Sequence, residues 1–302
     1  MYFTGFADEA GPTVATQIQA TQELGWRFIE ARNVNGKNIH DLSDAEFEEA
    51  GAKLAAAGVG INCFGSTIAN WGKQIAEPFA SSLAEAKRAI PRMQRLGTKL
   101  VRIMSFAVRK EADGADAADQ MEAERFRRVR ELVALFTDAG ITPVHENCMN
   151  YGGMSWQHTL RLIENVPGLK LAFDTGNPVF TDDRGKAPPY PKQSAWEFYS
   201  RVKEHIAYVH IKDGVWDYQA NKPVFTHANE GQGSVFAILK DLLAGGYDGG
   251  LSIEPHLAVV FHDATVQSEA AAKFANYVEY GRRFMRLVEQ IQADLRTEGK
   301  LR

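Results

Sequence analysis

Cysteine is scarce in this sequence, with two residues among 302. Cys63 and Cys148 lie far apart and do not form the paired spacing of a zinc site. The N-terminus lacks a basic stretch followed by an apolar one, so we predict no signal peptide and a cytoplasmic location. In that reducing compartment the two cysteines are expected to stay free thiols rather than form a disulfide.

Long apolar runs and an excess of basic residues are also absent. No segment approaches the roughly 18 consecutive apolar residues that a membrane-spanning helix needs. The formal net charge is −4, which provides no basic footprint for nucleic acid. We therefore expect neither a membrane nor a nucleic acid as a partner.

One pattern recurs along the chain, in which a helical segment is followed by a glycine and then by a short apolar segment. Glycine just after a helix adopts the left-handed conformation without a clash from Cβ, and it turns the chain back. Repeated helix-to-strand returns are typical of βα units and a parallel sheet. The pattern occurs at Gly25, Gly58, Gly97 and Gly140, with looser copies at Gly168 and Gly245-Gly246.

Eight expected strands alternate with eight expected helices, which favours an α/β fold of the (β/α)8 TIM barrel type, as a single domain over residues 1–302. The alternative is an open doubly wound sheet, but the Gly-x-Gly-x-x-Gly loop that often follows its first strand is missing. The expected strands cover residues 2–7, 26–31, 59–64, 99–105, 141–146, 169–174, 206–212 and 250–254. The expected helices cover residues 13–24, 43–57, 77–96, 115–139, 155–165, 194–204, 234–244 and 264–293.

Four of the expected strands carry a metal-ligand side chain at or near their C-terminal end. In a parallel barrel these ends lie at one rim, so the side chains can converge. Three carboxylates and one imidazole without a thiolate suit a single divalent ion, with Mn²⁺ preferred and Mg²⁺, Co²⁺ or Zn²⁺ as alternatives. Without a metal the carboxylates would repel one another. The residues are Glu146, Asp174, His210 and Glu254.

Several short motifs point to a known family. They are His145-Glu146-Asn147, Phe173-Asp174-Thr175-Gly176-Asn177, His210-Ile211-Lys212-Asp213, Glu230-Gly231-Gln232-Gly233 and Ile253-Glu254-Pro255-His256. Over nearly its whole length the chain resembles the sugar phosphate isomerase/epimerase family of xylose isomerase-like TIM barrels. That family includes ketose 3-epimerases, hydroxypyruvate isomerases and inosose dehydratases. The resemblance implies that Glu146, Asp174, His210 and Glu254 hold one divalent metal.

The resemblance also implies an activity, which is metal-dependent isomerisation or epimerisation of a keto-sugar or related polyol. A metal that binds a carbonyl oxygen and a neighbouring hydroxyl makes the intervening C–H more acidic and stabilises the enediolate. Two carboxylates on opposite sides can then remove and return the proton. In the epimerases that the chain resembles, the residues matching Glu146 and Glu254 do this, and we assign both as the catalytic pair.

Three positions depart from those ketohexose epimerases. Asn177 stands where they carry a histidine, Gly152 where they carry a glutamate, and Trp216 where they carry an arginine. Because asparagine cannot carry a proton, His145 or Lys212 is the candidate for a different acid or base. The alternative function is therefore a lyase or dehydratase that acts on a keto-sugar, an inosose or a 3-keto-glycoside by β-elimination.

The candidates for contact with a small-molecule carbohydrate are polar and aromatic residues near strand ends and in long loops. Lys212 lies two residues after His210 and shares its inward side, although a salt bridge to Asp174 or Asp213 is an equal alternative. For the aromatic residues the alternative is packing, and for His256 it is a structural hydrogen bond. The full set of substrate-binding candidates is Asn62, Trp71, Asn177, Lys212, Trp216, Glu230 and His256.

Two other classes of protein are weighed against an isomerase. A DNA-repair endonuclease of the same barrel superfamily uses three zinc ions and grips phosphates with basic residues, whereas this chain has a net negative charge. A non-catalytic sugar-binding protein would not need the Glu146 and Glu254 pair. We also expect a homodimer, in which aromatic residues of the last helix pack either on the barrel or at the interface, namely Phe274, Tyr277, Tyr280 and Phe284.

Overall fold

The computed structural model describes residues 1–258 and 268–301, and it contains one eight-stranded parallel sheet with the order β1-β12-β9-β8-β7-β6-β5-β2. A parallel bridge between Phe6 and Glu30 connects the two outer strands, so the sheet forms a nearly closed barrel. The strands are β1 (Tyr2–Gly5), β2 (Phe28–Ala31), β5 (Gly60–Gly65), β6 (Leu100–Ile103), β7 (Thr142–Glu146), β8 (Lys170–Asp174), β9 (Ile206–Ile211) and β12 (Gly250–Ile253).

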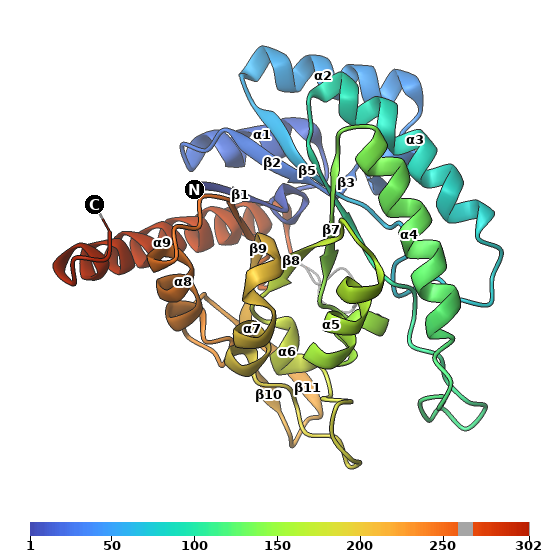
Figure 1. Cartoon of the computed structure of the whole chain (residues 1–302). Coiled ribbons are helices and arrows are strands. Elements are labelled where there is room, and N and C mark those ends of the chain that lie inside the picture. The colour runs from blue at the N-terminus through green and yellow to red at the C-terminus, as the bar shows by residue number, and fades with distance from the viewer. Residues whose placement is uncertain (259–267, 302) are drawn as a thin grey trace.

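Helices surround this barrel on the outside (Figure 1). Apolar side chains of the longer helices pack against the strands in one hydrophobic core, which is the layer order of a (β/α)8 fold. The predicted single-domain TIM barrel is confirmed. The helices are α1 (Val14–Glu23), α2 (Asp44–Ala57), α3 (Ala80–Leu96), α4 (Glu122–Asp138), α5 (Trp156–Asn165), α6 (Asn177–Phe180), α7 (Ala195–Val202), α8 (Val235–Ala244) and α9 (Ala270–Thr297), with 3-10 turns η1 (Ala7–Glu9), η2 (Ile39–Asp41), η3 (Tyr151–Met154) and η4 (Lys203–His205).

Local sequence signals account for several helix ends. Ser43 and Glu46 form the reciprocal capping box that starts α2. Gly58 and Gly97 end α2 and α3 in the left-handed conformation, with φ of 66° and 71°. These glycines turn the chain directly into β5 and β6, as the repeated helix–glycine–strand pattern predicts.

Three helix boundaries differ from the prediction. Helix α4 begins at Glu122 rather than near residue 115, because Lys110 and Asp116 bridge in a small turn and Met121 is left-handed at φ 53°. Helix α3 begins at Ala80 instead of residue 77. Helix α9 runs from Ala270 to Thr297, and the predicted residues 264–267 lie outside the described part of the chain.

Two long connections extend from the C-terminal end of the barrel, at the bottom of Figure 1. The connection after β8 contains α6. The connection after β9 forms an antiparallel hairpin of β10 (Asp213–Asp217) and β11 (Lys222–Thr226). A second small hairpin, β3 (Asn33–Val34) and β4 (Lys37–Asn38), follows β2. Phe180 and Phe225 contact each other edge to face at 5.0 Å, so the two long connections pack together.

The aromatic residues of the C-terminal helix pack on the barrel. Tyr277, Tyr280 and Phe284 of α9 are buried within the single chain, and Phe3 of β1 contacts Phe284 edge to face at 5.8 Å. The predicted homodimer remains a prediction. Both cysteines are buried free thiols, as expected. Within residues 1–258 and 268–301, no helix has the length and apolarity required to cross a membrane.

Candidate metal centre and active-site cavity

Four buried side chains converge at the C-terminal rim of the barrel. Glu146 and Asp174 are the last residues of β7 and β8, His210 lies one residue before the end of β9, and Glu254 directly follows β12. One ligand atom from each residue lies within 4.8 Å of those of the other three. Because each side chain comes from a different parallel strand, closure of the barrel produces this convergence.

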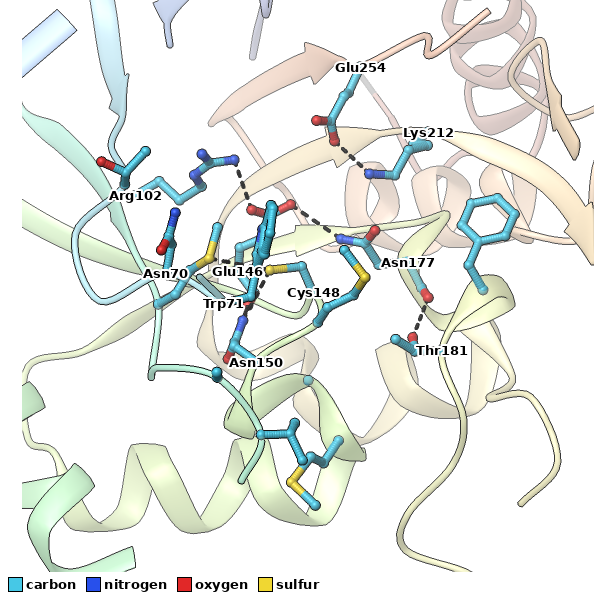
Figure 2. Close-up of a pocket in the computed structure, with 18 of the residues that line it drawn as sticks. Asn70, Trp71, Arg102, Glu146, Cys148, Asn150, Asn177, Thr181, Lys212 and Glu254 are labelled. Atoms are coloured by element: carbon cyan, nitrogen blue, oxygen red, sulfur yellow. Dashed lines mark hydrogen bonds and ion pairs between the residues drawn. The ribbon is translucent and has the colours of Figure 1, made fainter. Parts of the chain in front are cut away.

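Arg102 and Asn177 hold the two oxygens of the Glu146 carboxylate (Figure 2). Arg102 Nη1 donates to Oε2 at 2.9 Å, and Asn177 Nδ2 donates to Oε1 at 3.2 Å. Burial alone would raise the pKa of Glu146, but the charge of Arg102 and a hydrogen bond from His210 outweigh it and lower the pKa to about 2. Glu146 is therefore an anion at neutral pH.

Glu254 is held in the same way between Arg32 and Lys212. Arg32 Nη1 donates to Oε1 at 2.8 Å, and Lys212 Nζ donates to Oε2 at 2.7 Å. Burial opposes ionisation, but Lys212, His256 and Arg32 together keep the pKa of Glu254 well below its ordinary value. Each of the two glutamates thus has one oxygen anchored by an arginine from the N-terminal half of the chain.

Asp174 has one satisfied oxygen and one unsatisfied oxygen. The backbone N–H groups of Gly176 and Asn177 donate to Oδ1 at 2.8 and 2.7 Å. Oδ2 is buried and accepts no hydrogen bond from the described residues, although Lys212 Nζ lies 3.0 Å away. Burial raises the pKa of Asp174 to about 6 despite the charge of Lys212. A bound cation would satisfy this oxygen.

His210 is fixed by carboxylates on both ring nitrogens. Nε2 lies 3.1 Å from the Glu30 carboxylate, which also accepts a hydrogen bond from Ser252 Oγ at 2.6 Å. Nδ1 lies 3.3 Å from Glu146 Oε1. Burial would lower the pKa of His210, but Glu30 and Glu146 raise it to about 10. A carboxylate behind a ligand imidazole is the usual arrangement that orients a metal-binding histidine.

The donor set fits a single divalent ion. Three carboxylates and one imidazole, with no thiolate among them, suit Mn²⁺, Mg²⁺, Co²⁺ or Zn²⁺. The orphaned Asp174 Oδ2 and the Glu30-oriented ring of His210 agree with that chemistry. Binding of an ion would displace the proton of His210 and compete with Lys212 for Asp174 and Glu254. Metal binding by these residues remains a prediction.

A cavity of about 660 Å³ adjoins this cluster, and both Glu146 and Glu254 line it. Polar groups therefore converge in a partly open cavity, which is a usual form of a small-molecule site. Four of the predicted substrate contacts also line the cavity, namely Trp71, Asn177, Lys212 and His256. Their contact with a substrate is still a prediction.

Comparison with known proteins identifies the family. The family described as the xylose isomerase-like TIM barrel matches residues 18–277, which is most of the chain. This protein belongs to the xylose isomerase-like TIM barrel family. The family assignment made from the short motifs is confirmed. No protein of curated function matches the sequence.

Solved structures share the fold of this xylose isomerase-like barrel at low sequence identity. A xylose isomerase-like TIM barrel protein from Mycobacterium smegmatis, solved in complex with magnesium, is 19% identical with a TM-score of 0.67 over 95% of this chain and 97% of that one. An L-ribulose 3-epimerase is 17% identical with a TM-score of 0.64 over 98% and 96%. The probable 3-DHS dehydratase AsbF of petrobactin synthesis from Bacillus anthracis is 15% identical with a TM-score of 0.67 over 94% and 99%.

Three predicted substrate contacts of this xylose isomerase-like barrel lie away from the cavity. Asn62 faces the barrel interior, where it bonds Thr4 Oγ1 at 3.0 Å and Tyr208 OH at 2.9 Å, because the pairing of β2 with β5 shifts register beside it. Trp216 is covered by the Lys192 ammonium at 3.6 Å from its ring. Neither residue lines the cavity, and their contact with a substrate stays an untested prediction.

Glu230 is the third residue that lies elsewhere. Its carboxylate is exposed and pairs with Arg283 of α9 at 3.2 Å. The Gly231 and Gly233 N–H groups that follow it both donate to the buried carboxylate of Asp213, at 3.0 and 2.7 Å. The glycine-containing motif thus holds the loop around Asp213, and its N–H groups are not available to a substrate phosphate.

His145, the other candidate acid or base, points away from the barrel axis. Its Nε2 lies 3.0 Å from both Ser105 Oγ and Asn150 Oδ1. Burial lowers the pKa of His145 to about 4, so the ring is neutral at physiological pH. Its partners form a structural network beneath η3, and His145 does not line the cavity.

Sequence reasoning missed three charged residues at the centre of the barrel, Glu30, Arg32 and Arg102. Arg32 and Arg102 both lie over the Phe6 ring, at 4.2 and 5.1 Å from its centroid, and each reaches one of the two glutamates. A signal was present in the sequence. Arg102 and Glu30 interrupt otherwise apolar strands, and a charge inside a buried strand needs a partner of opposite charge.

Proposed function

We propose that this protein is a divalent-metal-dependent isomerase or epimerase that acts on a keto-sugar or a related polyol. The observation that carries the proposal is the buried convergence of Glu146, Asp174, His210 and Glu254 at a cavity of small-molecule size. Membership of the xylose isomerase-like family and the fold shared with an L-ribulose 3-epimerase support it. The neighbour solved with magnesium supports a hard divalent ion, and Mn²⁺ remains our first choice.

The chemistry assigns a separate task to each residue. When bound, the ion supplies polarisation of the substrate carbonyl and compensation of the charge that develops on its oxygen. The Glu146 carboxylate would accept the proton from the carbon next to the carbonyl, and Glu254 would pass to the opposite face a proton taken from the Lys212 ammonium, which donates to it at 2.7 Å. Arg102 and Asn177 bond the two oxygens of Glu146, and Arg32 and Lys212 bond those of Glu254, so both carboxylates are held in a defined orientation.

A lyase or dehydratase is the second candidate, and the position of Asn177 favours it. Asn177 donates its amide to Glu146, so the residue that replaces the histidine of ketohexose epimerases orients a base and carries no proton. Lys212 lies in the cavity 2.7 Å from Glu254, where its ammonium can donate to a leaving oxygen. In that reaction Glu146 or Glu254 removes the proton and the β-oxygen leaves with a proton from Lys212.

The first test is metal content. After dialysis against Mn²⁺ and then buffer, we expect one ion per chain in the wild type and none in the Asp174→Ala/His210→Ala double variant. No stoichiometric ion in the wild type would overturn the metal-dependent function and leave a non-catalytic sugar-binding protein as the alternative.

The second test is hydrogen exchange. We expect Mn²⁺-dependent exchange of a keto-sugar C–H with D₂O, and a fall of at least about 100-fold in the Glu146→Gln and Glu254→Gln variants. Glu49→Gln on the exposed side of α2 is the matched control and should exchange at the wild-type rate. Release of water or of an aglycone, followed by absorbance of the enone product, identifies a lyase. Near-wild-type exchange in either active-site variant rules out the assigned pair.

A further inference from the structure

The cavity is larger than the sugar that its polar end is proposed to bind. A hexose occupies roughly 180 Å³, about the volume of six water molecules. The cavity volume of about 660 Å³ is more than three times as large. A free monosaccharide at the carboxylate cluster would therefore leave most of the cavity to solvent.

The remaining lining of the cavity is mixed, and it includes a group of large apolar side chains beside polar ones such as Asn70, Gln74 and Thr181. The large apolar side chains that line the cavity are Trp71, Met104, Val108, Met149, Phe180 and Phe225. Trp71 and Met149 are 41% and 46% exposed, which is uncommon for side chains of this size. Exposed apolar side chains that gather around a cavity mark a binding surface.

The apolar wall begins next to the reactive carboxylates. Phe225 contacts the His256 ring edge to face at 5.0 Å, and His256 Nε2 lies 3.8 Å from Glu254 Oε1. Near the other glutamate, Met104 Sδ accepts from Cys148 Sγ at 3.4 Å, and Cys148 follows Glu146 by two residues. A substrate held at the carboxylates would place a substituent directly against these apolar side chains.

The charged residues of the cavity do not favour a phosphate as that substituent. Every lysine and arginine among the described lining residues already pairs with a carboxylate of the protein. Lys110 and Arg184 both bind Asp116. The cations nearer the cluster are Arg32, Arg102 and Lys212, each bound to Glu254 or Glu146. An anionic group would have to break one of these pairs.

We propose that the outer part of the cavity is a subsite for an apolar group, of about one or two aromatic rings, attached to the sugar. The substrate class is then a glycoside or other conjugate with an apolar aglycone, not a free sugar or a sugar phosphate. This inference rests on the proposed function for the position of the sugar, at the carboxylate end. Trp71 and Phe225 supply the flat and edge contacts for the ring.

The test compares phenyl and methyl glycosides of the same hexoses, with and without a 3-keto group, by calorimetric titration of the Mn²⁺-loaded protein. Burial of a phenyl ring predicts that the phenyl glycoside binds about 10- to 50-fold more tightly than its methyl counterpart. Trp71→Ala and Phe225→Leu should each reduce that ratio at least about threefold. Trp196→Ala is the matched control, because Trp196 is 43% exposed on α7 and outside the cavity.

Each outcome decides the proposal. Equal affinity for both glycosides in the wild type, or binding of neither at millimolar concentration, would show that no apolar subsite exists. A phenyl preference that survives in both cavity variants, or one lost in Trp196→Ala, would place the ring elsewhere. Hydrogen exchange of the same substrates is measured separately. A preference for the phenyl glycoside without any exchange would contradict the proposed activity and support the subsite. Exchange without that preference would support the activity and contradict the subsite.

Discussion

Replacement of Lys212 by methionine should destabilise the metal-free protein and strengthen metal binding at the same time. Lys212 Nζ lies 3.0 Å from Asp174 and 2.7 Å from Glu254, with all three side chains buried. Removal of one partner of a buried ion pair typically costs about 3–5 kcal/mol, because the other charge stays buried without compensation. Methionine has a similar length, so the lost interaction is mainly the charge and little of it is packing.

A bound divalent ion should reduce that cost. The ion and the ammonium neutralise the same two carboxylates, so removal of Lys212 also removes the cation that repels the ion. We expect the Lys212→Met variant to bind Mn²⁺ at least about tenfold more tightly, which corresponds to about 1.4 kcal/mol. The loss of unfolding free energy should therefore be smaller by that amount or more in the Mn²⁺-saturated protein than in the metal-free protein.

Urea unfolding of the metal-free and the Mn²⁺-saturated protein, followed by circular dichroism, gives the loss of unfolding free energy in each. The difference between the two losses should equal the change in Mn²⁺ binding free energy obtained by titration. Lys53→Met is the control, because Lys53 is exposed and pairs with Glu49 on the surface of α2. It should change neither quantity by more than about 0.5 kcal/mol. If Lys212→Met does not fold without metal, Mn²⁺ should restore folding, and Lys212→Gln gives the milder comparison. An equal loss of stability with and without Mn²⁺ would refute the shared role of Asp174 and Glu254.

Two further predictions concern the scaffold around the site. Burial lowers the pKa of His158 to about 4, whereas a histidine in the unfolded chain protonates near pH 6.5. As the pH falls from 6.5 to 5, the wild type should therefore lose stability relative to His158→Gln by up to about 1.4 kcal/mol per pH unit. A difference in urea midpoints that stays constant over this pH range would contradict the prediction. A Cβ on Gly153 would lie 1.7 Å from the Cys148 carbonyl oxygen, so Gly153→Ala should lower stability by roughly 2–4 kcal/mol, while Gly51→Ala in helix α2, 3.5 Å from Leu96, should raise it by about 0.5–1 kcal/mol. Thermal unfolding of the two alanine variants measures both changes in stability. A similar change in unfolding temperature for Gly153→Ala and Gly51→Ala would be evidence against the clash at Gly153.

The barrel and its four-residue cluster were predictable from local patterns. Apolar segments bounded by glycines such as Gly58 and Gly97 specify strands and their direction without any long-range information. Once the strands are parallel and closed, their C-terminal residues must share one rim. The proximity of Glu146 and Glu254 could therefore be predicted, although 108 positions of sequence separate them. The start of helix α4 was mispredicted, because the turn before it depends on the bridge between Lys110 and Asp116, which helix propensity does not predict.

The sequence by itself determined the order of strands, the family and the residue types at the strand ends. Tertiary structure alone decided what surrounds them. Asn62 faces inward at the barrel floor because of a register shift, and Glu230 turns outward to Arg283, and neither outcome is visible in local periodicity. Arg32, just after β2, reaches Glu254 across 222 residues of sequence, and Arg102 on β6 reaches Glu146 on the neighbouring strand β7 across 44. The physical reason is that hydrophobic periodicity and turn-forming residues act locally in the sequence. Charge pairing and the shape of a cavity depend instead on which distant side chains come into contact when the barrel closes.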